Sequence, residues 1–133
     1  MCISKEEREK REFRLTNPSH VLQMFKERGK DLFGCDLVKE MLEETQRHIK
    51  NDKRCVICPD SREGIKSNHL AMFLTDAGGF AVIPVHIDDK YITILTIKDL
   101  SKDDHINWHI DQYNKIGKER GVTPMRLRFK GDI

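Results

Sequence analysis

The 133-residue sequence lacks a long hydrophobic run. Its longest apolar stretch extends from Phe80 to Val85, and only if Pro84 is counted, whereas a membrane-spanning helix needs about 20 apolar residues. The first ten residues contain no apolar signal core and no glycine for myristoylation. We therefore expect no membrane association and a cytoplasmic location.

An excess of charge of one sign is also missing. The sequence has 24 Lys and Arg against 22 Asp and Glu, a formal net charge of +2. The overall charge therefore identifies no partner, although it permits a local basic patch. The sequence also has no glycine-rich phosphate loop, nucleophile elbow or kinase signature, which disfavours nucleotide-dependent enzymes.

Cysteine is scarce, with four residues at positions 2, 35, 55 and 58. Without a signal peptide, reduced thiols are expected rather than disulfides. Cys55 and Cys58 have zinc-knuckle spacing that His69 or His86 could complete, but a second pair is missing. In a strand, two thiols three positions apart would also point to opposite faces. We expect neither a metal nor a cofactor, and a zinc-stabilised adaptor remains an alternative.

The length and the order of patterns predict one α+β domain over residues 18–133, preceded by an N-terminal arm or short helix over 1–17. Asn17 and Pro18 predict a helix start, and Gly29 predicts its end, which gives a helix over 18–28. Asp36 is the predicted cap of a second helix that extends to residue 50. A third amphipathic helix is expected over 102–118.

Short apolar runs separated by turn residues predict an antiparallel meander of four strands, at residues 55–58, 69–75, 80–87 and 91–98. The N-terminal helices should cover one face of this curved sheet. The side chains expected on that covered face are Leu70, Met72, Leu74, Ala81, Ile83, Val85, Ile92 and Ile94. A final strand is expected over 125–130, where apolar and basic residues alternate strictly.

The hairpin turns determine which polar side chains meet on the open face of the sheet. A four-residue loop over 76–79 would place His69 opposite His86. A two-residue turn at Asp88 and Asp89 would place His86 opposite Tyr91. The sequence thus predicts a row of two imidazoles and a phenol, pointing away from the helices.

Such a row suits general acid and base catalysis near neutral pH. Metal-free RNA cleavage needs one group to take the proton of the 2′-hydroxyl and another to return a proton to the leaving 5′-oxygen, with cations at the phosphate. The cations would come from Arg126, Arg128 and Lys130 on one face of the final strand, and from Arg62 in a loop. The basic residues of the final strand are equally typical of a solvated edge strand, and a single loop arginine is a weak signal.

The segment Pro-Ser-His-Val-Leu-Gln-Met-Phe-Lys-Glu-Arg-Gly at 18–29, followed by a second helix and a meander ending in Ile-Thr-Ile-Leu-Thr-Ile at 92–97, resembles small RelE-like toxins, especially the BrnT-like subset. His20, Lys26 and Arg28 match the pattern of the first helix in that family. The insertion at 59–68 and the helix at 102–118 depart from it. The resemblance implies a ribosome-dependent or free ribonuclease that arrests growth and is restrained by an antitoxin or immunity protein.

In this interpretation, His69, His86, Tyr91 and His20 are the candidate catalytic residues, and Arg28 joins the RNA-binding set. His20 lies in the first turn of its helix, where the helix dipole favours a neutral imidazole base. The expected function is therefore that of an RNA-binding protein and a metal-independent endoribonuclease. The alternative is a non-enzymatic protein-binding module, such as an inhibitor or immunity protein, whose sheet face meets a protein partner.

Overall fold

The structure, a computed structural model, describes residues 5–50, 55–60, 66–99 and 106–119. The predicted final strand at 125–130 lies outside these ranges, and so do Arg62, Arg126, Arg128 and Lys130. The described residues confirm the α+β class, with four helices and a sheet of five strands that does not close on itself.

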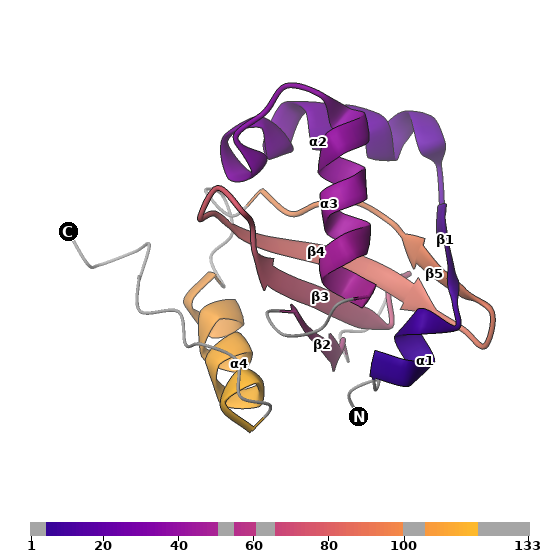
Figure 1. Ribbon diagram of the computed structural model, residues 1–133, viewed down its shortest axis with the longest axis vertical. Coiled ribbons are helices and arrows are strands. Elements are labelled where there is room, and N and C mark those ends of the chain that lie inside the picture. The colour runs from indigo at the N-terminus through magenta and orange to yellow at the C-terminus, as the bar shows by residue number, and fades with distance from the viewer. Residues whose placement is uncertain (1–4, 51–54, 61–65, 100–105, 120–133) are drawn as a thin grey trace.

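One sheet with the strand order β1-β5-β4-β3-β2 forms the centre of the molecule (Figure 1). Its strands are β1 (Glu12–Leu15), β2 (Cys55–Pro59), β3 (His69–Leu74), β4 (Phe80–Ile87) and β5 (Tyr91–Ile94). Strands β2 to β5 form the predicted antiparallel meander. Strand β1 pairs with β5 in parallel, which makes the sheet mixed. The segment expected as an arm or short helix contains both the short helix α1 (Lys5–Glu9) and the strand β1, which was not predicted.

Helix α2 (Pro18–Phe33) is longer than predicted, because Gly29 does not end it. The helix ends at Gly34, which adopts the left-handed conformation with φ 67° and donates its N–H to the Lys30 carbonyl at 2.9 Å. Gly29 is buried, and a Cβ atom there would lie 2.7 Å from Met41 Sδ. Gly29 thus permits the close approach of α3 (Val38–Lys50) to α2.

The start of α3 also differs from the prediction. The helix begins at Val38, with the Met41 N–H donated to the carbonyl of Leu37 at 3.1 Å. Asp36 instead pairs with Lys30 Nζ at 3.4 Å. At the other end of α3, the buried Arg8 of α1 donates from Nη1 to the Ile49 carbonyl at 3.3 Å, which satisfies one of the last carbonyls of the helix.

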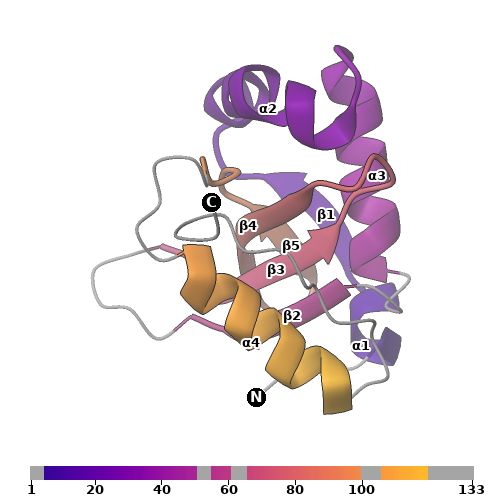
Figure 2. The ribbon, with the colours of Figure 1, turned by 90° about the vertical axis from the view of Figure 1, so that its left-hand side faces the viewer.

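Helices lie on both faces of the sheet (Figure 2), and an apolar layer forms between the sheet and the helices on each side. Helices α2 and α3 pack on one face, as predicted. Helix α4 (Ile106–Glu119) lies across β2 and β3 on the other face. The sheet residues of the α2/α3 layer are Cys55, Ile57, Ala71, Phe73, Ala81, Ile83, Val85, Ile87, Ile92 and Ile94. Those of the α4 layer are Val56, Cys58, Leu70, Met72, Phe80 and Val82, with Leu74 at its margin.

The predicted register between β3 and β4 is wrong by one residue. Leu74 pairs with Phe80 and His69 pairs with Val85, so His69 does not oppose His86. The cause is the turn, because Thr75 donates its N–H to the Gly79 carbonyl at 2.8 Å and leaves three residues in the loop instead of four. Because side chains alternate between faces, this slip moves Leu70, Met72 and Leu74 to the α4 layer.

The turn between β4 and β5 is displaced as well. Asp88 donates its N–H to the Tyr91 carbonyl at 3.1 Å, so the two turn residues are Asp89 and Lys90. His86 therefore pairs with Thr93 rather than with Tyr91. This displacement is by an even number of positions, so His86 and Tyr91 remain on the same face of the sheet.

None of the helices in the described ranges combines the length and apolar character needed to cross a bilayer. The buried apolar side chains form two clusters, one on each face of the sheet.

The tip of the β3–β4 hairpin packs against the C-terminal end of α2, and Gly79 is the closest point. A Cβ atom on Gly79 would lie 2.8 Å from the Leu32 carbonyl oxygen and 3.0 Å from its Cα. We expect Gly79→Ala to lower the free energy of unfolding by about 1–3 kcal/mol, because the backbone of α2 must shift. Urea denaturation followed by circular dichroism measures this loss. The exposed neighbour Ala77→Ser should change stability by less than about 0.5 kcal/mol, and equal effects would contradict the proposed clash.

Candidate active site on the open sheet face

His86 and Tyr91 share the sheet face opposite α2 and α3. His86 is exposed on β4, and its cross-strand partner on β5 is Thr93. Tyr91, two residues before Thr93, is half-buried and is therefore a diagonal neighbour of His86. On this face, helix α4 covers β2, β3 and the first part of β4, where Phe80 contacts Tyr113 with ring centroids 5.4 Å apart. His86, near the end of β4, and Tyr91 of β5 lie outside the α4 layer. We call the surface around them the open face.

Arg14 of β1 completes a polar cluster on the open face. It pairs with Thr93 in the parallel register, and its Nε donates to Thr93 Oγ1 at 3.0 Å. Its guanidinium carbon lies 4.2 Å from the centre of the Tyr91 ring, a cation–π contact. The Arg14 side chain is 54% exposed, so its guanidinium can also bind an anion from solution.

Sequence reasoning missed Arg14 because it lies in the segment expected to be an arm or short helix, for which no strand was predicted. The available signal was the alternation of polar and apolar residues in Glu12-Phe13-Arg14-Leu15. Phe13 and Leu15 pack on the α2/α3 layer, which turns Glu12 and Arg14 to the open face. Four residues of alternation are a short pattern, and the partner strand lies far away in sequence.

Asp88 places a carboxylate at the margin of the cluster. Its Oδ1 accepts the backbone N–H groups of Lys90 and Tyr91 at 2.8 and 2.7 Å. These hydrogen bonds, with the charge of Arg14 nearby, lower the pKa of Asp88 below its ordinary value. Its Oδ2 lies 4.0 Å from the Arg14 guanidinium. The carboxylate therefore fixes the turn that holds Tyr91 and limits the net positive charge beside it.

His69 lies on the face of α2 and α3, because it pairs with Val85. The imidazole is half-buried, and its Nδ1 lies 2.8 Å from Asn68 Oδ1. The same Asn68 side chain accepts the Ile87 N–H at 2.8 Å and donates to the Ile87 carbonyl at 2.9 Å. Burial, assisted by the charges of His86 and Arg11, lowers the pKa of His69. His69 and His86 thus do not form the predicted row.

The two candidates on α2 are also separate from the open face. His20 is exposed in the first turn, where its backbone N–H is donated to Asn17 Oδ1 at 3.4 Å. Arg28 donates from Nη1 to the Ile97 carbonyl at 2.8 Å and so ties the chain after β5 to α2. Cys55 and Cys58 are both buried, one in each layer, as the spacing in a strand predicts.

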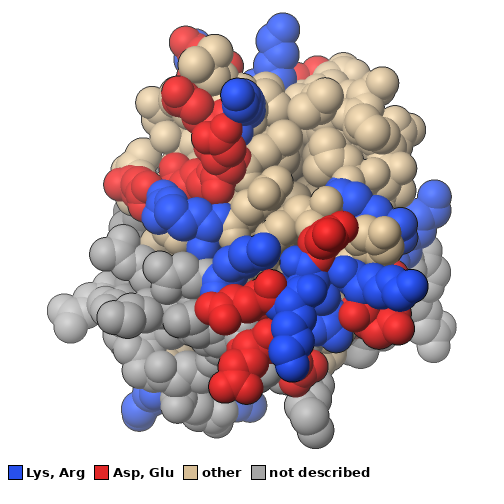
Figure 3. Space-filling model, turned by 45° about the vertical axis from the view of Figure 1, so that its right-hand side comes forward, with Lys and Arg blue, Asp and Glu red and all other residues tan. Residues whose placement is uncertain are grey.

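Positive charge does not dominate the surface around the β1 edge. In Figure 3, Lys and Arg side chains lie among Asp and Glu side chains on the face shown. Electrostatic attraction of RNA by this face would therefore be local, at groups such as Arg14.

Comparison with known proteins finds no match to this chain among family models, curated proteins or solved structures.

The lowered pKa of His69 predicts a loss of stability in mild acid. Between the lowered pKa and the ordinary value of 6.5, the unfolded chain binds a proton at this imidazole that the folded chain excludes. The contribution of His69 to the free energy of unfolding is therefore fully present above the ordinary histidine pKa. It is lost as the pH decreases from that pKa to the lowered one. We expect His69→Gln to reduce the loss of stability between about pH 7.5 and about pH 5. Urea denaturation at both pH values measures it, and an unchanged loss would show that His69 is not the responsible group.

Proposed function

We propose that this protein is a metal-independent endoribonuclease of toxin type whose active site is the open-face cluster of Arg14, His86 and Tyr91. The observation that carries the proposal is the placement of an exposed imidazole, a phenol and a half-exposed guanidinium on adjacent strands of the open face. These are the group types that RNA cleavage without a metal requires.

The roles follow from the chemistry of each group. The His86 imidazole accepts the proton of a ribose 2′-hydroxyl as its oxygen attacks the adjacent phosphorus. The bond from phosphorus to the 5′-oxygen breaks, and the Tyr91 hydroxyl supplies the proton that the leaving oxygen takes. The products are a 2′,3′-cyclic phosphate and a free 5′-hydroxyl. A proton transfer between solvent, His86 and Tyr91 restores the starting state.

Arg14 is the candidate for stabilising charge on the phosphate. Its contacts with Thr93 and the Tyr91 ring hold the guanidinium next to the proton donor. Only Nε is used in the contact with Thr93, so the terminal nitrogens can form a paired hydrogen bond to phosphate oxygens. Asp88 competes weakly for them, at 4.0 Å.

The resemblance to RelE-like toxins supports the type of activity and the partners: a cytoplasmic RNA substrate, free or on the ribosome, and a restraining antitoxin or immunity protein. The remaining candidate cations, Arg28, Arg62, Arg126, Arg128 and Lys130, would extend the RNA contact beyond the reacting phosphate. Arg28 is the weakest of these, because its guanidinium already holds the Ile97 carbonyl.

The test is cleavage of mixed cellular RNA, and of ribosome-bound messenger RNA, by purified protein in excess chelator. We expect His86→Gln and Arg14→Gln each to lower the cleavage rate about 100-fold or more, since one removes the proton acceptor and the other the phosphate contact. Tyr91→Phe should lower it more than about 10-fold. His69→Gln should retain activity within about 3-fold, because that imidazole lies on the other face.

Lys39→Gln, at an exposed position on α3, is the matched control for loss of a surface cation. Circular dichroism spectra and thermal unfolding should show that every variant is folded. Intact RNA with the wild-type protein, both free and on ribosomes, would contradict the proposed function. Equal loss of activity in His69→Gln and His86→Gln would contradict the assignment of the site.

A non-enzymatic protein-binding module is the second candidate, favoured by the exposed edge of β1. Within the described residues, β1 pairs only with β5, so its other edge can accept a strand from a partner. Under this alternative, His86→Gln leaves function intact. The N–H groups of Glu12 and Thr16 are donated to β5, so the alternating N–H of Leu15 points to the outer edge. Leu15→Pro, in protein that circular dichroism shows to be folded, should therefore abolish capture of the partner.

A further inference from the structure

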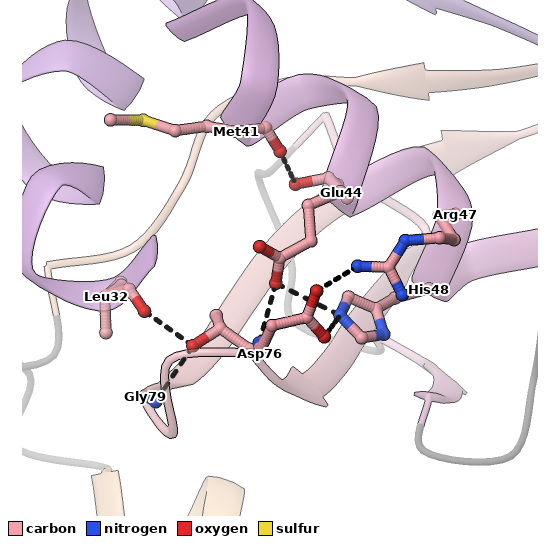
Figure 4. A network of polar contacts seen from close by, with 9 residues as sticks. Leu32, Met41, Glu44, Arg47, His48, Asp76 and Gly79 are labelled. Atoms are coloured by element: carbon pink, nitrogen blue, oxygen red, sulfur yellow. Dashed lines mark hydrogen bonds and ion pairs between the residues drawn. The ribbon is translucent and has the colours of Figure 1, made fainter. Parts of the chain in front are cut away.

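A second polar cluster lies where α3 meets the tip of the β3–β4 hairpin, away from the open face. Glu44 and His48 are one turn apart on α3, and Asp76 is the first residue after Thr75 in the hairpin turn. Figure 4 shows the Glu44 and Asp76 carboxylates and the His48 imidazole pointing toward one another. Among the described residues, this is the set whose side chains have the types and spacing of metal ligands.

The distances between the ligand atoms fit a small tetrahedral ion. His48 Nε2 lies 3.1 Å from Glu44 Oε2 and 3.5 Å from Asp76 Oδ1, and all three atoms lie within 4.8 Å of one another. Bonds of about 2.0–2.1 Å at tetrahedral angles separate two zinc ligands by about 3.3–3.4 Å. Small rotations of the two carboxylates would therefore place all three atoms around one Zn²⁺ ion.

The imidazole is already oriented for this role. His48 is 5% exposed, and its ring stacks on Phe73 with centroids 4.7 Å apart and an interplanar angle of 24°. Packing thus fixes the ring with Nε2 directed at the carboxylates. A metal ligand held in this way loses little conformational freedom on binding.

The charges of the cluster favour a cation. The Glu44 side chain is only 14% exposed, and its Oε2 accepts the Asp76 N–H at 2.9 Å. Arg47 contacts Oδ2 of Asp76, which leaves Oδ1 directed at His48. With a neutral imidazole, the single guanidinium offsets one of two carboxylates, so a largely buried negative charge remains. A divalent ion would neutralise it, and Arg47 would then orient Asp76 from behind.

We propose that Glu44, His48 and Asp76 form a Zn²⁺ site that joins α3 to the β3–β4 hairpin. The three side chains supply one nitrogen and two oxygen ligands. Asp76 is 55% exposed, so water can occupy the fourth position. Bound zinc fixes the hairpin turn against α3.

The test is calorimetric titration of chelator-treated, dialysed protein with zinc chloride. We expect one ion per chain and a rise in melting temperature with added zinc. Asp76→Asn and Glu44→Gln should each weaken binding about 10-fold or more, because each replaces an anionic ligand. Both changes keep the side-chain size, and Asp76 is exposed, so these variants test the site even where His48→Gln proves too unstable to purify.

Two matched controls keep the charge change and move it away from the cluster. Asp89→Asn lies in the other hairpin turn, and Glu43→Gln neighbours Glu44 on the exposed side of α3. Both should bind zinc with the wild-type affinity. The proposal is overturned by absence of binding in the wild-type protein, or by equal affinities of Asp76→Asn and Asp89→Asn.

Substitution with Co²⁺ provides a second readout. Nitrogen and oxygen ligands in a tetrahedral site give visible absorption without the near-ultraviolet charge-transfer band of thiolate ligation. A thiolate band that persists in Asp76→Asn would assign the metal to cysteine and overturn the proposal. The open-face residues play no part in this cluster, so the zinc result is independent of the RNA cleavage assay.

Discussion

The three-residue turn between β3 and β4 determines the layout of the whole sheet. Because side chains alternate along a strand, the position of this turn decides which residues of β3 pack under α2 and α3 and which pack under α4. The turn is itself held in place by α2, since Thr75 Oγ1 donates to the Leu32 carbonyl and accepts the Gly79 N–H. Helix packing, turn geometry and sheet register are therefore one coupled constraint.

That constraint also separates two polar regions of the molecule. On the α3 side, the same turn presents Asp76 to Glu44 and His48. On the other side, the even displacement of the β4–β5 turn keeps His86 and Tyr91 together beside Arg14. His69 marks the boundary, because it is drawn to the helix side by its pairing with Val85 and held by Asn68.

The sequence predicted the elements of the fold well, because their signals are local. Helical periodicity predicted α3 and α4, and short apolar runs separated by turn residues predicted β2 to β5. Gly29 misled the prediction of the end of α2, since glycine serves equally to end a helix and to let a neighbour approach, and only the position of Met41 distinguishes the two. The register between β3 and β4 could not be predicted for a similar reason. Whether Gly79 lies in the loop or pairs with Thr75 depends on its close contact with the backbone of Leu32. Arg14 and the Glu44–His48–Asp76 cluster depend on contacts between distant segments, which periodicity does not report.

The parallel pairing of β1 with β5 bears on how the protein is made. Arg14 and Thr93 are 79 positions apart in sequence, so β1 leaves the ribosome long before its partner strand exists. Contacts of such sequence separation are slow to form, because a long loop must close first. During synthesis the β2–β4 hairpins can therefore form before the edge of the sheet is completed. The open face acquires its guanidinium late, once most of the described chain has been translated.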